Sequence, residues 1–450
     1  MGNGFEGKAV LNSSAMARNK KILIISYYWP PAGGPGVQRW LKMSWYLAEL
    51  GCDITVLSID PDHANFPHRD ESLSDEVHPS IKVHRTKAFN PYGLLQRITG
   101  KKGASQASFS IPKTGRLKFK ILAFFRSHLF IPDPRKGWNA HAYKRAAELM
   151  RETNFDHLIT TSPPHSSQLI GRRLKREFGV HWIADFRDPW TEIFFYNDVG
   201  HSWISRRIDR AYEKSVMFES DMIFVVTYGM KTLFQNKLQG WNAPNVADKV
   251  KVLTNGYDER DFAQLRPKQE SSTFRLVMTG TLSTLYNYEV VFDVLGELGA
   301  AGLEFAVDVY GRVPHDVQQH ILTLCSRVAF HGDVSHAQIN QIQVDSELLL
   351  LFLPDTPDYY LLLPGKLFEY LRAGTEILIL GPNDGDAARV ISQCAAGTSI
   401  EKAEKEKIKH FLKEAISDHQ AGIRKRPVNA SEIQVFSRAA VAKQVLEYLD

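Results

Sequence analysis

Lys366 and Glu369 stand three residues apart, directly after the turn signal Pro364-Gly365. On a helix that begins at this turn, the two side chains share one face near the N-terminus. Free N–H groups at a helix N-terminus attract phosphate, a lysine adds positive charge, and a carboxylate one turn further on can accept hydrogen bonds from ribose hydroxyls. The pair therefore indicates a nucleotide site, although an ordinary surface Lys/Glu pair would show the same spacing.

The flanking residues predict the helix that carries this pair. Leu367, Tyr370 and Leu371 fall at positions i, i+3 and i+4 and form an apolar stripe for the core. Gly374 stands where a helix needs a left-handed residue at its end. Apolar runs at 348–353 and 377–380 predict a buried strand on each side of the helix.

The segment from Pro364 to Gly374 resembles the nucleotide-sugar-binding helix of the family 4 (group 1) retaining glycosyltransferases. That family has the α/β fold called GT-B, in which two doubly wound parallel-sheet (Rossmann-like) domains enclose an interdomain cleft and a C-terminal helix crosses back. The resemblance spans nearly the whole chain from Lys21. It implies that Gly365 and Lys366 hold the nucleotide diphosphate and that Glu369 holds the ribose.

A glycine-rich loop joins the first predicted strand, Lys21 to Ser26, to a helical pattern that begins near Val37. Such a loop lets the backbone approach phosphate or sugar closely, and it matches neither a dinucleotide fingerprint nor a P-loop. Glycosyltransferases of the resembling family have a double-glycine loop here, which implies that Gly33 and Gly34 line the reaction centre. Arg39 is a candidate phosphate contact at the helix start. A turn that only sets helix packing is the alternative.

Two polar clusters follow predicted strands in the first half of the chain. His165 follows the strand 156–161, while Arg187 and Asp188 follow the strand that ends at Asp185. The carboxyl edge of an open parallel sheet forms its ligand crevice, so these side chains are candidates for acceptor binding and catalysis. A locally bonded loop histidine and a structural ion-pair cluster are the alternatives.

The strand and helix patterns form two series. The second series begins at Phe274, and its first crevice loop contains Gly280 and Thr281. Two such series predict two doubly wound parallel domains. The expected division is a flexible N-terminus (1–19), an acceptor-binding domain (20–255, completed by a crossover helix at 435–450) and a nucleotide-sugar-binding domain (256–434).

Charge is distributed unevenly along the 450 residues. Residues 81–150 hold 15 Lys and Arg against two acids, a local charge of +13, so the remainder must sum to −8 to give the overall +5. Within them, Arg116 to Phe130 reads as a basic amphipathic segment able to lie on an anionic membrane surface, or as a core helix with a solvated face. No nucleic-acid-binding motif is present, so nucleic acid is not an expected partner.

Other features favour a cytoplasmic protein, peripheral at the inner face of the membrane. No run reaches the ~18 apolar residues of a membrane span, and no secretory signal is visible. The three cysteines have neither disulfide nor zinc spacing. Asp60-Pro-Asp62 and Asp384-Gly-Asp386 match a D-x-D metal signature by chance in turn-rich contexts, so neither a metal nor another cofactor is expected.

The resemblance implies a retaining transfer of sugar from a nucleotide-diphosphate sugar to a glycan or lipid-linked anionic acceptor, in surface polysaccharide biosynthesis. Lys366, Arg39 or Arg312 would neutralise the leaving diphosphate, and His165 or Asp188 would be the base in an inverting enzyme. The chain departs from the family at Leu361, where many members carry a second glutamate. The usual Arg and Lys are also not recognisable in 280–287. A GT-B-type nucleotide-sugar epimerase and a non-catalytic sugar-nucleotide-binding protein are the alternatives.

Overall fold

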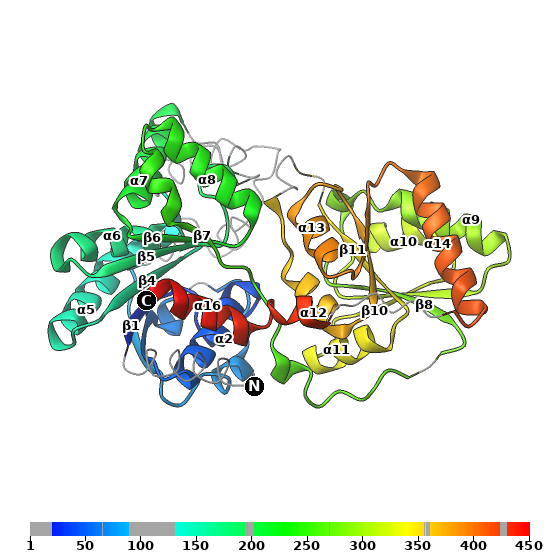
Figure 1. Cartoon of the computed structure of the whole chain (residues 1–450), viewed down its shortest axis with the longest axis horizontal. Helices are drawn as coiled ribbons and strands as arrows, with labels where there is room; N and C mark the ends of the chain where they lie inside the picture. Colours follow the sequence, from blue (N-terminus) through cyan, green and yellow to red (C-terminus); the bar gives the residue numbers. More distant parts are fainter. Residues whose placement is uncertain are drawn as a thin grey trace, which may run out of the picture. The chain divides into compact units, whose positions relative to one another are not determined.

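The chain forms two compact units in the computed structural model, which is drawn in Figure 1. The structure describes residues 20–64, 66–89, 131–193, 196, 202–269, 271–354, 356, 361–423 and 430–450. Unit 1 comprises the chain up to residue 226, residues 230–254 and residues 442–450, whereas unit 2 comprises residues 227–229 and 255–441. The predicted segments 1–19 and 116–130 lie outside the described residues.

Unit 1 is built on a parallel sheet with the strand order β3-β2-β1-β4-β5-β6-β7 among the described residues. Sheet order and chain order diverge between β1 and β4, since the chain runs outward to β3 before returning to β4. The strands are β1 (Lys21–Ile25), β2 (Asp53–Ile59), β3 (Lys82–Thr86), β4 (His157–Ser162), β5 (His181–Phe186), β6 (Met222–Val225) and β7 (Val250–Val252).

Helices connect these strands and cover the sheet. Helices α5 and α6 pack against each other, and α6 also contacts β4, β5 and α7. Alternate side chains of the strands, such as Leu23 and Ile25 of β1, enter a core cluster with Trp138 and Trp182. The helices are α2 (Pro35–Glu49), α5 (Asn139–Glu152), α6 (Ser166–Phe178), α7 (Trp203–Glu219) and α8 (Tyr228–Gly240), whose first residues belong to unit 2.

Unit 2 repeats the pattern with the strand order β10-β9-β8-β11-β12-β13 in the part of the chain that the structure describes. Its order and chain order diverge between β8 and β11. The strands are β8 (Phe274–Thr279), β9 (Phe305–Tyr310), β10 (Val328–Gly332), β11 (Leu348–Phe352), β12 (Glu376–Leu380) and β13 (Gly397–Ile400).

Helices cover both faces of this second sheet. Strand β11 shows why, because Leu348 and Leu350 enter one core cluster while Leu349 and Leu351 enter the other. Figure 1 shows α9, α10 and α14 on one side and α11, α12 and α13 on the other. The helices are α9 (Glu289–Ala300), α10 (His315–Leu324), α11 (His336–Asp345), α12 (Gly365–Ala373), α13 (Asp386–Gln393), α14 (Lys405–Gln420) and α15 (Ala430–Gln434).

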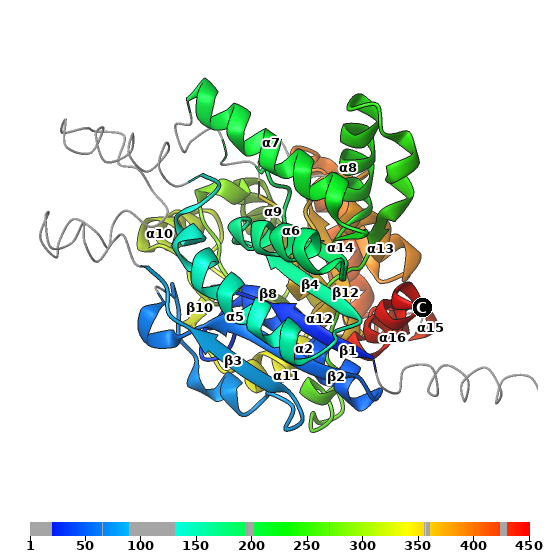
Figure 2. The same cartoon turned by 90° about the vertical axis from the view of Figure 1, so that its left-hand side faces the viewer.

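The final helix, α16 (Arg438–Leu449), begins in unit 2 and ends in unit 1. The Lys20 ammonium donates to the carbonyl oxygen of Leu449 at 2.7 Å, which fixes the end of the chain beside β1, as Figure 1 shows. Figure 2 presents the molecule from the side and shows β3, β2, β1 and β4 of unit 1 next to one another. The predicted fold class, with two doubly wound parallel sheets and interleaved helices, is confirmed.

Candidate functional site

Each sheet has a topological switch point, where the connections that follow two neighbouring strands run in opposite directions. In unit 1 this point lies between β1 and β4, and in unit 2 it lies between β8 and β11. Ligands of open α/β sheets bind outside the carboxyl ends of the strands at such a point. The loops that follow β1, β4, β8 and β11 are therefore the places to look for functional side chains.

Lys366 lies across this point in unit 2. It belongs to the first turn of α12, which follows β11, and its ammonium donates to the carbonyl oxygen of Thr279 in β8 at 2.7 Å. A Cβ atom placed on Gly280 would lie 2.6 Å from that ammonium, so the glycine leaves room for the lysine. Burial lowers the pKa of Lys366 to about 8, and nearby Glu369 opposes the shift. The structure thus brings Gly280, Gly365 and Lys366 to one sheet edge.

Tyr370 fixes α12 against β8, a role that the sequence pattern assigned only to packing. Its hydroxyl lies 2.9 Å from the Thr279 hydroxyl and accepts a hydrogen bond from the Thr279 N–H at 3.0 Å. The ring is fully buried, and burial raises the pKa of the phenol to about 12. This contact sets the position of the Lys366 turn relative to the strand. Its signal in the sequence was a tyrosine, rather than an aliphatic residue, within an apolar stripe.

Glu369 lies on the next turn of the helix with 28% of its side chain exposed. His336, the first residue of α11, approaches it with 3.2 Å between Nε2 and the carboxylate. Among the described residues, His336 is the hydrogen-bond partner of the carboxylate, and its exposed part remains open to a ribose hydroxyl that could donate to it. His336 was not among the predicted site residues, because it precedes Glu369 by 33 positions.

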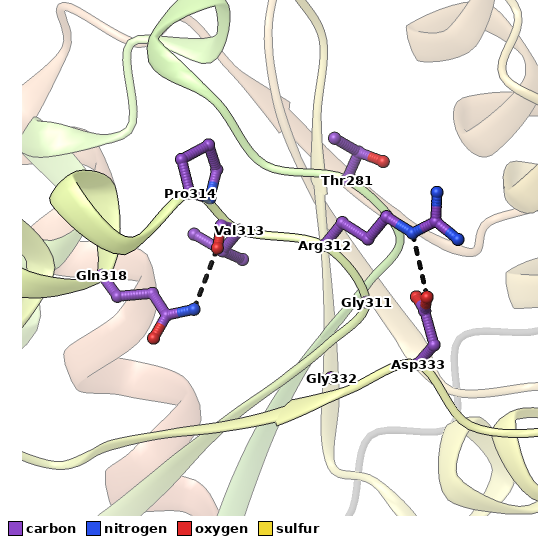
Figure 3. A pocket seen from close by; sticks show the side chains of 8 residues that line it. All are labelled: Thr281, Gly311, Arg312, Val313, Pro314, Gln318, Gly332 and Asp333. Atoms are coloured by element: carbon purple, nitrogen blue, oxygen red, sulfur yellow. Dashed lines mark hydrogen bonds and ion pairs between the residues drawn. The ribbon is translucent and has the colours of Figure 1, made fainter.

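A hollow of about 510 Å³ opens at the carboxyl ends of β8, β9 and β10. Figure 3 shows its lining, with Thr281 from the loop after β8 and Arg312 and Asp333 from the next two loops. Arg312 donates from Nε to the Asp333 carboxylate at 2.9 Å, and 73% of its side chain is exposed. Since such an exposed pair contributes little to stability, the guanidinium can turn to a ligand at small cost.

The glycine loop of unit 1 has the tight geometry that its composition predicts. The Gly33 N–H donates to the carbonyl oxygen of His68 at 3.0 Å, and a Cβ atom on Gly33 would lie 3.1 Å from that of Asp70. Gly34 precedes α2 with φ of 91°, a conformation that side chains rarely adopt, and the space around its Cβ position is open. The loop therefore exposes backbone at the end of β1, as a ligand-binding loop would.

Arg39 requires a correction. It is buried rather than facing a ligand, and its guanidinium forms a forked ion pair with Asp185 at the end of β5, with 2.8 Å between Nη2 and Oδ1. Trp40 and Thr161 donate to the other carboxylate oxygen, each at 2.7 Å. A buried pair of this kind costs several kcal/mol to break. Arg39 and Asp185 therefore fasten α2 to the sheet and are not free for a phosphate or an acceptor.

Arg187 also makes structural contacts. Its guanidinium donates to the carbonyl oxygens of Ser162 at 2.9 Å, Gly36 at 2.5 Å and Pro163 at 3.2 Å. These bonds clamp together the loops after β4 and β5 and the start of α2. This geometry favours a positioning role for Arg187 over the predicted catalytic one.

Asp188 differs from its neighbour because its carboxylate has no hydrogen bond to another described residue. Burial raises the pKa of this carboxyl group, and Arg187 beside it opposes the shift. A partly exposed carboxylate with a raised pKa is a reasonable proton acceptor. Asp188 therefore remains a candidate at the edge of the first sheet.

His165 stands at the start of α6 with its ring stacked on Trp190, at 5.0 Å between centroids and 11° between planes. Its Nδ1 atom is buried and lacks a hydrogen-bond partner among the described residues, and so does the indole nitrogen of Trp29 in the loop after β1. Burial, then Arg187, then Lys237 lower the pKa of His165 to about 3, so the imidazole is neutral at physiological pH. Two unpaired polar atoms follow neighbouring strands, as expected where a ligand hydroxyl or water binds.

The network behind this histidine was not found from the sequence. The Trp190 indole and the Tyr196 hydroxyl both donate to Asp209, at 2.7 Å and 2.9 Å. Asp209 lies on the buried side of α7, where burial raises its pKa to about 7. The arrangement holds the loop after β5 against α7. In the sequence, only the Trp and Asp residues of the loop after β5 and of α7 indicated this network.

Two remaining predictions concern Leu361 and metal ions. Leu361, at the position where many members of the resembling family carry a glutamate, is 5% exposed and presents no polar group. Asp60 caps a short helical turn by accepting from the Asp62 N–H, while Asp386 is buried and accepts from the Gly229 N–H at 2.7 Å. No group of three His, Cys, Asp or Glu side chains with the geometry of a metal site occurs within the described ranges.

Within the described ranges, no helix is both long and apolar enough to cross a membrane.

Solved structures share the fold over almost the whole chain. Sucrose-phosphate synthase from Thermosynechococcus elongatus matches with a TM-score of 0.58 and 14% identity, covering 95% of this chain and 98% of its own. The Anabaena protein HepE, solved with UDP and glucose, matches with a TM-score of 0.58 and 14% identity, covering 96% and 99%. The chain thus has the GT-B fold of these proteins. No protein-family model matches the sequence, and no curated protein matches it.

A structure described as a putative UDP-N-acetylglucosamine 2-epimerase from Listeria monocytogenes also matches. Its TM-score is 0.51 and its identity 10%, with 95% of each chain covered. The fold is therefore shared by proteins of more than one described activity. The side chains at the two sheet edges must decide between them.

Proposed function

We propose that this protein is a retaining glycosyltransferase that moves a sugar from a nucleotide-diphosphate sugar to a glycan or lipid-linked anionic acceptor. The observation that carries the proposal is the contact of Lys366 with Thr279 beside Gly280. It brings a positive charge, a helix N-terminus and open backbone together at the point where ligands bind in open α/β sheets. These groups suit a diphosphate.

The donor would be held by unit 2. Gly365 and Lys366 bind the diphosphate, Thr281 lies in the loop beside it, and Glu369 accepts from the ribose. Negative charge grows on the diphosphate as the glycosidic bond to the sugar breaks, and fixed positive charge stabilises it. Lys366 and the exposed Arg312 supply that charge, so the proposed transfer needs no metal ion or other cofactor.

The acceptor would be held by unit 1, near Gly33, Gly34, His165 and Asp188. In a retaining transfer the departing phosphate takes the acceptor proton, and the neutral imidazole of His165 orients the hydroxyl. Asp188 is the base in the inverting variant of this proposal. The basic composition of residues 81–150 supports an anionic acceptor at the cytoplasmic face of a membrane, as in surface polysaccharide biosynthesis.

Donor binding is tested by the thermal stability of the protein with UDP-, GDP-, TDP- and ADP-sugars. A ligand at about 100 times its dissociation constant raises the free energy of unfolding by roughly 2.7 kcal/mol. We expect one nucleotide class to stabilise the wild type and the matched control Glu406→Ala, an exposed site on α14, but not Glu369→Ala. If none of these nucleotide sugars stabilises the wild type, the protein has no site for them. That result would contradict both the transferase and the non-catalytic sugar-nucleotide-binding protein.

An epimerase is the second candidate, because the fold is shared with the Listeria protein. The two activities differ in product. A transferase leaves the donor sugar unchanged until an acceptor is added, and a retaining one then preserves its anomeric configuration. Conversion of the free nucleotide sugar to its epimer, followed by NMR without acceptor, would identify the epimerase instead.

Metal dependence is tested by the rate of sugar transfer with and without a chelator. We expect the same rate in both, because the proposed transfer uses no metal ion.

A further inference from the structure

Helix α7 carries large apolar side chains on its solvent side. Trp203 is 73% exposed, Ile204 49% and Ile208 38%. The opposite side of the helix is buried and holds Asp209 and Glu213. A helix of a globular protein normally turns its apolar side chains inward, and clustered exposed ones indicate an interaction surface.

The same side of α7 is basic. Arg207, Arg210 and Lys214 are exposed and lie between the apolar side chains on the helical turn. Neither guanidinium forms an ion pair with another described residue. The acids of the helix do not offset this charge, since Asp209 and Glu213 are buried and Glu219 pairs with Arg176. The surface therefore combines apolar area with three basic side chains that the acids of the helix do not neutralise, and the Lys214 ammonium also lies over the rings of Phe218 and Trp241.

We propose that this surface docks on an anionic lipid membrane. The α7 face, defined as Trp203, Ile204, Arg207, Ile208, Arg210 and Lys214, has the composition of a helix that lies in a membrane interface. Its aromatic and aliphatic side chains enter the headgroup boundary while its basic side chains contact acidic headgroups. A second copy of the chain fits less well, because a symmetric contact would bring the same positive charges face to face.

Helix α7 lies next to the loop that carries Asp188, so docking through α7 bears on the proposed acceptor site. Both views show α7 at the margin of unit 1 (Figures 1 and 2). The buried side of the helix accepts hydrogen bonds from Trp190 and Tyr196 through Asp209, which fixes the loop that carries Asp188. A membrane bound by the outer side of α7 would therefore lie near a loop of the proposed acceptor site. This consequence rests on the proposed function, whereas the docking itself does not.

The docking is tested by flotation of the full-length protein with phosphatidylcholine vesicles, with and without phosphatidylglycerol. We expect binding only to the anionic vesicles, weakened by added salt. The double variant Arg207→Glu/Arg210→Glu is expected to lose affinity by roughly 30-fold or more. The control Lys413→Glu/Lys443→Glu makes the same charge change on exposed positions of α14 and α16 and is expected to bind like the wild type.

A second readout places the contact at the helix itself. Lipids brominated along the acyl chain are expected to quench tryptophan fluorescence of the wild type, and to quench Trp203→Phe less although it still binds. Failure of the wild type to bind anionic vesicles would overturn the proposal, as would equal losses in the two double variants. A concentration-dependent dimer abolished by Arg207→Glu/Arg210→Glu would identify a second copy as the occupant. Nucleotide-dependent stabilisation of the same variants separates failure of docking from failure of the proposed function.

Discussion

At the scale of single residues, Lys366 and His165 differ in charge. Lys366 is partly buried beside a carbonyl oxygen, and its burial lowers its pKa to about 8. An ammonium group so placed has given up water and gains most when an anion approaches. His165 is neutral because burial and two nearby cations lower its pKa to about 3. Lys366 therefore suits a diphosphate, and His165 suits a hydroxyl group.

The Lys366 pKa predicts how donor affinity depends on pH. The ammonium is charged below pH of about 8 and neutral above it, so affinity for a nucleoside diphosphate is complete below this pH and falls as pH rises through it. A bound diphosphate will raise the pKa of Lys366 in the complex, because the negative charge favours the ammonium form. We expect isothermal titration calorimetry to show this fall for the wild type and weak, nearly pH-independent binding for Lys366→Met. An equal fall in both proteins would assign it to another group.

At the scale of elements, glycines allow the loops of the second sheet to approach closely. A Cβ atom on Gly311, after β9, would lie 2.2 Å from the carbonyl oxygen of Gly280, after β8. Gly311 also has φ of 118°, in the range that favours glycine. The loops after β8 and β9 thus meet in close backbone contact at the edge of the sheet that carries the hollow and Lys366.

Substitution of Gly311 separates this contact from backbone strain. Gly302 has φ of 88° and open space around its Cβ position, so Gly302→Ala should cost only about 1–2 kcal/mol of strain. Gly311→Ala adds a clash with backbone and is expected to cost clearly more in urea denaturation. It should also weaken nucleotide-dependent stabilisation, which Gly302→Ala leaves intact. Equal losses of stability would mean that the loops after β8 and β9 can move apart freely.

At the scale of the whole molecule, the last residues of the chain complete unit 1 although they follow unit 2. Val445, Leu446 and Leu449 of α16 are buried, and Tyr448 lies 5.9 Å from the ring of Phe224 in β6. Lys20 pairs with Asp450 at 2.6 Å. The first sheet therefore depends on the far end of the chain.

Removal of residues 442–450 tests this dependence. Burial of a Val or Leu side chain contributes about 1.5–3 kcal/mol, so loss of three such side chains should remove about 5 kcal/mol or more from unit 1. Hydrogen exchange is expected to accelerate in β1, β4 and β5 and to change little in β8, β11 and β12. Retained protection of β1 would show that α16 contributes little. Retained nucleotide-dependent stabilisation would show that unit 2 still folds.

The sequence by itself determined the class of fold and the helix at the centre of the proposed donor site. Strong apolar runs such as 348–353 and strand-turn-helix alternation report local burial, and β11 and α12 form where those patterns predict them. Gly374 ends α12 with φ of 74°, as its position required. Strands β3 and β13 gave no such signal because they lie at sheet edges and bury their side chains incompletely.

Only the tertiary structure decided which polar side chains remain available for a ligand. The sequence predicts Arg39 as a phosphate contact, yet it pairs with Asp185, 146 positions away in the chain. Arg187 likewise binds loop carbonyls, whereas the half-buried Asp188 beside it makes no hydrogen bond to another described residue. The reason is physical. Periodicity specifies which face of an element is apolar, but the partner of a charged side chain depends on strand order and helix packing, which join residues that are distant in sequence.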